Sequence, residues 1–324
     1  MEILFLGGTG IISTASVRLA AERGHRVTIL NRGRTSTRPV PEGVEVLQGD
    51  VEDAASLDGA IGDRTFDVVT QFRAFSPDHV RSDVARFAGR TGQYVFISSA
   101  SAYQKPPASV PVTESTPLKN PFWQYSRDKI AGEEALVAAY RDADFPMTIV
   151  RPSHTYDDTL LPTTGAWTDI ARMRDGRPVV VHGDGTTQWT LTHSDDFAVG
   201  FVGLLGRPET LGNAYTITGE SAPTWNQVYT WLGEAAGATP ELVHVTSDRI
   251  ARELPEIGPG LVGDKAHSML FDTTKLRRLV PEFTTTIPFS VGAKRLLAWY
   301  DANPDQQVVD ADLDAAFDRL VASA

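Results

Sequence analysis

Tyr125 and Lys129 are the residues whose types and spacing point most directly to chemistry. Residues four apart share one face of a helix, and the pattern over Ser126–Tyr140 predicts such a helix. A free phenol is a poor base because its pKa is near ~10. An adjacent ammonium favours the phenolate, so we expect Lys129 to lower the pKa of Tyr125 by roughly one to three pH units. The pair could then move a proton to or from a substrate oxygen.

Three serines follow a predicted buried strand over Gln93–Ser98, in the run Ser98-Ser99-Ala100-Ser101. Ligands bind beyond the carboxyl ends of parallel strands, where a hydroxyl can donate to an oxygen that gains charge. We predict Ser99 as the catalytic serine beside Tyr125 and Lys129. The competing interpretation is that these serines only form a turn.

A glycine-rich loop, Gly7-Gly8-Thr9-Gly10-Ile11-Ile12, joins the apolar strand Ile3–Leu6 to an amphipathic helix over Ser13–Arg23. Glycines allow a tight turn there, and the free N–H groups and dipole of the helix start stabilise a diphosphate. The order of strand, loop, helix and second strand makes a dinucleotide site the favoured interpretation. Ser13 stands where such loops usually carry a third glycine, and its side chain is small enough to fit.

The second strand, Arg26–Leu30, ends in Asn31-Arg32-Gly33-Arg34 without the carboxylate that usually holds the ribose of NAD. Arg32 and Arg34 could instead pair with the 2′-phosphate of NADP. NADP is therefore the predicted cofactor, with NAD as the alternative. Solvated surface arginines are the competing interpretation.

Further candidate cofactor residues follow the other strands. Asp50 could reach the adenine amino group or, alternatively, cap the next helix. Lys129 could also hydrogen-bond the nicotinamide ribose. The complete predicted cofactor set is Gly7, Thr9, Gly10, Ile11, Ile12, Asn31, Arg32, Arg34, Asp50, Val51, Phe72, Ser98, Tyr125, Lys129 and Pro152.

Short Val- and Ile-rich strands alternate with helices through the first half of the chain, which predicts a parallel sheet covered on both faces. Further strands are expected at Val44–Leu47, Asp67–Thr70, Met147–Arg151 and Ala214–Thr218. The predicted fold is α/β, a Rossmann-type doubly wound parallel sheet with a smaller C-terminal α+β substrate lobe. Residues 1–152 would form the dinucleotide-binding domain, with returning segments near 189–219, and residues 153–324 mainly the substrate lobe.

Together these motifs resemble an extended short-chain dehydrogenase/reductase of the NAD-dependent epimerase/dehydratase family. The similarity also includes Gly49-Asp50-Val51, Arg151-Pro152, Gly183-Asp184-Gly185 and Asp195-Asp196-Phe197-Ala198. The resemblance implies catalytic roles for Ser99, Tyr125 and Lys129. It also implies a substrate lobe built from C-terminal segments.

Three departures from the family pattern bear on the substrate. Ala100-Ser101 replaces the acidic pair of the dehydratases, which argues against dehydration and is closer to the epimerase pattern. Trp189 stands where nucleotide-sugar enzymes place an arginine on the substrate diphosphate, and an indole cannot replace that guanidinium. Tyr156-Asp157-Asp158 replaces the usual Tyr-Gly-Pro. The candidate substrate residues are Arg73, Ser101, His154 and Trp189.

Composition limits the other function classes. The chain has 324 residues, a formal net charge of -11 and no cysteine, which argues against nucleic-acid binding and excludes disulfides and thiol chemistry. No histidine spacing suggests a metal site, and no stretch is long and apolar enough to span a bilayer. We therefore expect a cytoplasmic protein with a small-molecule substrate, no metal, no membrane contact and possibly a homodimeric assembly.

The predicted function is an NAD(P)-dependent oxidoreductase or epimerase that acts on a hydroxyl/carbonyl carbon of a sugar or other small metabolite. A simple NADPH-dependent ketone reductase of a non-nucleotide metabolite is the alternative. A further alternative is a non-catalytic NADP sensor or an RNA-binding protein, because the chain also resembles plant stem-loop-RNA-binding proteins of this fold. The retained Ser99, Tyr125 and Lys129 favour an enzyme.

Overall fold

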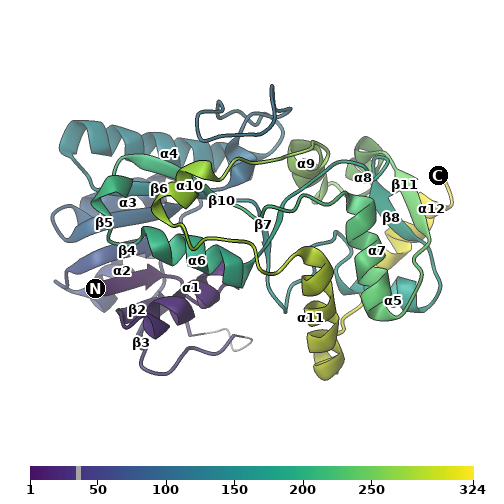
Figure 1. The fold of residues 1–324 in the computed structure, drawn as a ribbon, viewed down its shortest axis with the longest axis horizontal. Coiled ribbons are helices and arrows are strands. Elements are labelled where there is room, and N and C mark those ends of the chain that lie inside the picture. Colours follow the sequence, from purple (N-terminus) through teal and green to yellow (C-terminus); the bar gives the residue numbers. More distant parts are fainter. Residues whose placement is uncertain (34–37) are drawn as a thin grey trace.

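A seven-stranded parallel sheet lies at the centre of the computed structural model, which describes residues 1–33 and 38–324 (Figure 1). Its strand order is β10-β6-β5-β4-β1-β2-β3, so the direction of winding reverses between β1 and β4. All seven predicted strands are confirmed. They are β1 (Glu2–Leu6), β2 (Arg26–Asn31), β3 (Glu45–Gln48), β4 (Phe66–Gln71), β5 (Thr91–Ile97), β6 (Met147–Pro152) and β10 (Asn213–Ile217).

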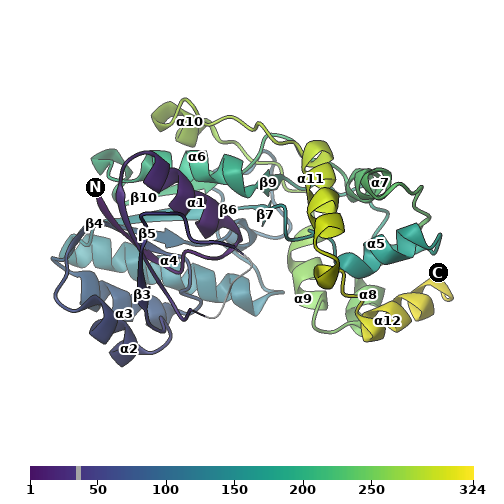
Figure 2. The same ribbon diagram turned by 90° about the horizontal axis from the view of Figure 1, so that it is seen from below.

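Helices cover both faces of the sheet because alternate strand residues point to opposite sides (Figure 2). On β1, Ile3 and Phe5 pack toward one helical layer, whereas Leu4 and Leu6 pack toward the other. The first layer contains α1 (Ile11–Glu22), α6 (Ser194–Leu204) and α10 (Thr274–Leu279), and the second contains α2 (Ala54–Ile61), α3 (Pro77–Phe87) and α4 (Gln124–Ala143). The doubly wound arrangement is therefore as predicted.

A separate group of elements, with an apolar core of its own, stands beside the carboxyl ends of the strands (Figure 1). Trp189, Trp225 and Tyr229 are large side chains of that core. The elements are β7 (His154–Tyr156), α5 (Trp167–Arg174), β8 (Val179–His182), β9 (Leu191–His193), α7 (Trp225–Ala236), β11 (Leu242–Val245), α8 (Ser247–Glu253), α9 (Gly258–Gly260), α11 (Phe289–Ala302) and α12 (Ala311–Val321). Between β9 and α7 the chain returns to the sheet as α6 and β10.

Within the described ranges, every helix is too short or too polar to cross a lipid bilayer.

A buried ion pair joins helix α4 to the sheet. The Arg151 guanidinium on β6 donates to both carboxylate oxygens of Glu133 on α4, at 2.9 and 2.5 Å. The Ser98 hydroxyl, just after β5, donates to the same carboxylate at 2.5 Å. Both charged residues are almost fully buried, so each depends on the other to offset the loss of hydration. The pair thereby fixes α4 against the ends of β5 and β6.

Replacing Glu133 by glutamine leaves the buried Arg151 guanidinium without its counter-charge. Because removing one partner of a buried pair costs about 3–5 kcal/mol, Glu133→Gln should lower the free energy of unfolding by about that much in urea titrations. Glu134→Gln, at the exposed neighbouring position, is the control and should change the free energy by less than about 0.5 kcal/mol. Equal stabilities of the two variants would contradict this role for the pair.

Candidate active site

The glycine loop takes a conformation that side chains would obstruct. Gly7 and Gly8 have φ angles of +113° and +115°, and a Cβ at Gly8 would lie 2.7 Å from Cγ2 of Ile29. Gly10 caps α1, and its N–H donates to the Ser13 hydroxyl at 2.8 Å. Ser13 thus fills the place of the third glycine and also satisfies the loop backbone. The result is a helix start that an anionic group can approach closely.

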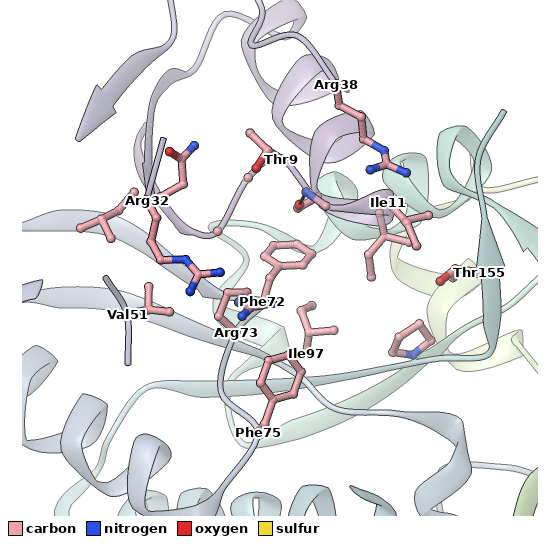
Figure 3. Close-up of a pocket in the computed structure, with 18 of the residues that line it drawn as sticks. Thr9, Ile11, Arg32, Arg38, Val51, Phe72, Arg73, Phe75, Ile97 and Thr155 are labelled. Carbon is pink, nitrogen blue, oxygen red and sulfur yellow. Dashed lines mark hydrogen bonds between the residues drawn. The ribbon is translucent and has the colours of Figure 1, made fainter. Parts of the chain in front are cut away.

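A cavity of about 500 Å³ opens at the carboxyl ends of the strands, next to the reversal between β1 and β4 (Figure 3). Ligands of doubly wound sheets bind at this place. Its lining includes the predicted cofactor residues Gly7, Thr9, Gly10, Ile11, Ile12, Asn31, Arg32, Asp50, Val51, Phe72, Ser98, Tyr125, Lys129 and Pro152. Arg34 lies outside the described residues. The N–H groups of the glycine loop and the Arg32 guanidinium are donors that fit the anionic groups of a dinucleotide.

Arg32 lies at one end of this cavity. Figure 3 shows its side chain extending into the cavity beside Val51, and its Nη1 is 4.0 Å from Oδ2 of Asp50. The Asn31 carboxamide oxygen shapes this turn by accepting from the N–H of Gly33 at 2.8 Å. The alternative that Asp50 caps the next helix is wrong, because Asp53 caps α2 through the N–H groups of residues 55 and 56.

Lys129 is buried one turn after Tyr125 on α4. Its ammonium donates to the backbone carbonyls of Ala74 at 2.7 Å and Ile97 at 2.8 Å. The Nζ atom is 5.7 Å from the centroid of the Tyr125 ring. Burial, with a smaller contribution from the charge of Arg73, lowers the pKa of Lys129 to about 7 against the opposing effect of Glu133.

The pKa of Tyr125 is raised in the structure, whereas the sequence predicted that it is lowered. Burial, together with the negative charge of Asp264, raises it to about 12 against the lowering effect of the hydrogen bond with Ser99. The expected depression by Lys129 is wrong for this structure, since the ammonium is directed to two carbonyls rather than to the phenol oxygen. Tyr125 is therefore protonated at neutral pH, which suits a proton donor.

A network of serines supports the Tyr125 site. The hydroxyls of Ser99 and Ser101 are 2.8 Å apart, and Ser126 donates to the Ser101 hydroxyl at 2.8 Å. The Asn120 carboxamide donates to the carbonyls of Ser101 at 2.9 Å and Gly263 at 2.7 Å. Ser101 is thus engaged in holding the loop, and Asn120 connects that loop to the distant segment that follows α9.

A second cavity of about 250 Å³ adjoins the first, and Ser99, Tyr125, Pro152 and Ser153 line both. Of the predicted substrate residues, Ser101, His154 and Trp189 line this second cavity, whereas Arg73 lines the first. Burial lowers the pKa of His154 to about 3, so its imidazole is neutral. The structure therefore brings together the predicted substrate residues, apart from Arg73, on one side of Ser99 and Tyr125.

Sequence reasoning missed the charged residues of the second cavity. Asp264 and Lys265 belong to a π-helical turn, Leu261–Lys265, that no sequence motif marks. The Asp264 carboxylate is buried 3.6 Å from the ammonium of Lys105, which lies 5.7 Å from the centroid of the Trp189 ring. Arg38, in the first cavity, was missed as well.

Comparison with known proteins places this site in a family. A model of the NAD dependent epimerase/dehydratase family matches residues 3–218. The 2′-dehydrokanamycin reductase of Streptomyces kanamyceticus is 27% identical over 291 residues, which cover 87% of this chain and 80% of that protein. The chloroplast stem-loop binding protein of 41 kDa b from Arabidopsis thaliana is 25% identical over 256 residues, 75% of this chain and 65% of that protein.

Among solved structures, the dTDP-glucose 4,6-dehydratase of Bacillus anthracis str. Ames in complex with NAD matches with a TM-score of 0.74 at 18% identity. The match covers 94% of this chain and 98% of that chain. These comparisons confirm the resemblance indicated by the motifs, and the structural match confirms the Rossmann-type fold.

The buried position of Lys129 predicts a pH-dependent stability. Between pH 7 and 10.5 an unfolded lysine binds a proton that folded Lys129 does not, so the cofactor-free protein becomes more stable as pH rises. Lys129→Met has no group that titrates at this position, so its stability lacks this pH dependence. The free energy of unfolding of the variant minus that of the wild type should therefore be highest below pH 7. Above pH 7 this difference should fall by up to about 1.4 kcal/mol per pH unit.

Urea titrations from pH 6 to pH 9 measure this difference, with the exposed Lys294→Met as the control. A difference that stays constant across this range would mean that the two backbone carbonyls keep Lys129 charged.

Proposed function

The chain belongs to the NAD-dependent epimerase/dehydratase family, and on that basis we propose that it transfers hydride between NADP(H) and a hydroxyl/carbonyl carbon of a small metabolite. The observation that carries the proposal is the position of Ser99 and Tyr125, which line both cavities. A substrate in the smaller cavity would meet these two hydroxyls at the boundary with the cofactor cavity. This is where an acid must stand to protonate an oxygen while the adjacent carbon reacts.

Tyr125, Ser99 and Lys129 have different roles in the proposed reaction. A nicotinamide bound in the larger cavity would supply hydride to a carbonyl carbon or accept it from an alcohol. Tyr125 donates a proton to the carbonyl oxygen, and the Ser99 hydroxyl donates a hydrogen bond to the same oxygen as it gains charge. Lys129, which lines the same cavity, would hold the nicotinamide ribose through its ammonium. The raised pKa of Tyr125 keeps the phenol protonated at neutral pH, which is the state that proton donation to a carbonyl oxygen requires.

The second cavity favours a non-nucleotide substrate with hydroxyl groups. Trp189 lines it where nucleotide-sugar enzymes carry an arginine, and an indole offers a diphosphate no positive charge. Ser99 and Ser101 line it as well, and their hydroxyls can both donate to and accept from the hydroxyl groups of a substrate.

We therefore favour an NADPH-dependent ketone reductase over an epimerase. The name of the Streptomyces kanamyceticus relative also describes a reductase. Epimerisation is the second candidate, because Ala100-Ser101 follows the epimerase pattern. RNA binding has less support, since the acidic chain keeps Ser99, Tyr125 and Lys129 together at one cavity.

Tyr125→Phe tests the proposed acid. Removing the phenol hydroxyl should lower NADPH oxidation with a panel of polyhydroxylated ketones at least about 100-fold, because a positioned general acid contributes about that much or more. The dissociation constant for NADPH should stay within about twofold, since the ring remains. Tyr140→Phe, at an exposed position of the same helix, is the control. Undiminished turnover in Tyr125→Phe would remove Tyr125 from the mechanism.

Arg32→Ala tests the choice of cofactor. Loss of the guanidinium should raise the dissociation constant for NADPH about tenfold at low salt and leave that for NADH within about twofold, because only NADPH carries the 2′-phosphate. Fluorescence titration with both dinucleotides measures this ratio, and Arg81→Ala on the exposed face of α3 is the control. An equal loss for both dinucleotides would contradict the 2′-phosphate role.

A further inference from the structure

Arg38 forms a salt bridge at the side of the larger cavity with a residue 119 positions away in the chain. Its Nε donates to Asp157 Oδ2 at 2.5 Å, and its Nη2 donates to Thr159 Oγ1 at 2.5 Å. The side chains of Arg38 and Asp157 are only 17% and 11% exposed, so salt screens the pair weakly. Arg38 lines the cavity itself.

Residues 157–159, which contain the partner of Arg38, are held by further hydrogen bonds. Asp157 Oδ1 accepts from both the N–H and the hydroxyl of Thr159, at 2.9 and 2.8 Å, which closes a tight turn. Tyr300 on α11 donates to the Thr159 carbonyl at 3.2 Å. Asp158 accepts from Nε2 of His193 at 3.0 Å. Arg38 is therefore tied to an anchored part of the substrate lobe.

Arg38 and Arg32 occupy different parts of the cavity. In Figure 3, Arg38 lies toward Ile11 and Thr155, whereas Arg32 lies toward Val51. Ile11 opens the first turn of α1, where the helix start receives a diphosphate. A dinucleotide in this cavity would thus have its diphosphate between the glycine loop and the Arg38 side.

We propose that the Arg38–Asp157 salt bridge retains the bound dinucleotide by closing the cavity on its diphosphate side. The inference rests on the proposed cofactor site. Because NADPH and NADH share the diphosphate, the salt bridge slows the release of both equally, unlike Arg32. Arg38 is a positioning residue here: it acts through its bond to Asp157, and release of the cofactor requires that bond to open.

Stopped-flow displacement of NADPH and of NADH measures the release rates. The variants are Arg38→Met, Asp157→Asn and the double variant; Arg81→Met, from the exposed pair with Asp78, is the control. Each single variant should release both dinucleotides at least about tenfold faster, because breaking a shielded charge pair acts mainly on dissociation. The double variant should be no more than about twofold faster than the faster single variant.

The outcomes separate the alternatives. Faster release in Arg38→Met with unchanged or slower release in Asp157→Asn would overturn the proposal, because Arg38 would then act without the salt bridge. Unchanged release in both variants would equally overturn it. Thermal melting verifies folding, and Arg38→Lys replaces Arg38→Met if that variant does not fold. If the wild type binds neither dinucleotide, both this proposal and the proposed function are refuted. If the release rates change as expected but the wild type reduces no ketone, only the proposed function is refuted.

Discussion

The rotation of helix α4 about its axis is the constraint on which the candidate site depends. Tyr125, Lys129 and Glu133 recur at intervals of four, so all three project toward the sheet. Glu133 is locked to Arg151 on β6, and Ser98 at the end of β5 donates to the same carboxylate. The buried pair therefore sets the direction of Tyr125 about two turns away. Arg151 also donates to the Tyr103 hydroxyl, which extends the same network toward β10.

Residues whose roles depend on chain neighbours were predictable from the sequence, and residues brought together by folding were not. The glycines at 7 and 8 are recognisable because strand, turn and helix follow one another directly. The seven strands were predictable for the same reason. Asp264, by contrast, lines the cavity from a π-helical turn whose Gly263 carbonyl accepts a hydrogen bond from Asn120. These residues are far apart in the chain, so no local sequence pattern predicts the contact.

The pKa of Tyr125 shows why spacing alone is insufficient for electrostatics. The interval of four residues indicates one neighbour, Lys129, and from it a lowered pKa. Folding adds the loss of hydration and the Asp264 charge, and it turns the ammonium toward two carbonyls. Desolvation then outweighs the one effect that lowers the pKa, the hydrogen bond with Ser99, because burial penalises the phenolate directly. The same packing that positions Tyr125 also keeps it protonated, which is the state that the proposed acid role requires.

The two aspartates that replace the usual Gly-Pro join the larger cavity to the first turn of α6. Asp157 binds Arg38 at the cofactor cavity, and Asp158 accepts from His193, whose Nδ1 in turn accepts from the first turn of α6. A glycine and a proline offer no side-chain acceptor, so neither contact would exist with the usual residues. An enzyme that exchanges its cofactor at each turnover must open such a bond every cycle, whereas an epimerase that keeps its cofactor has no such need. The strength of the Arg38–Asp157 bond thus bears on which of the two reactions this fold supports.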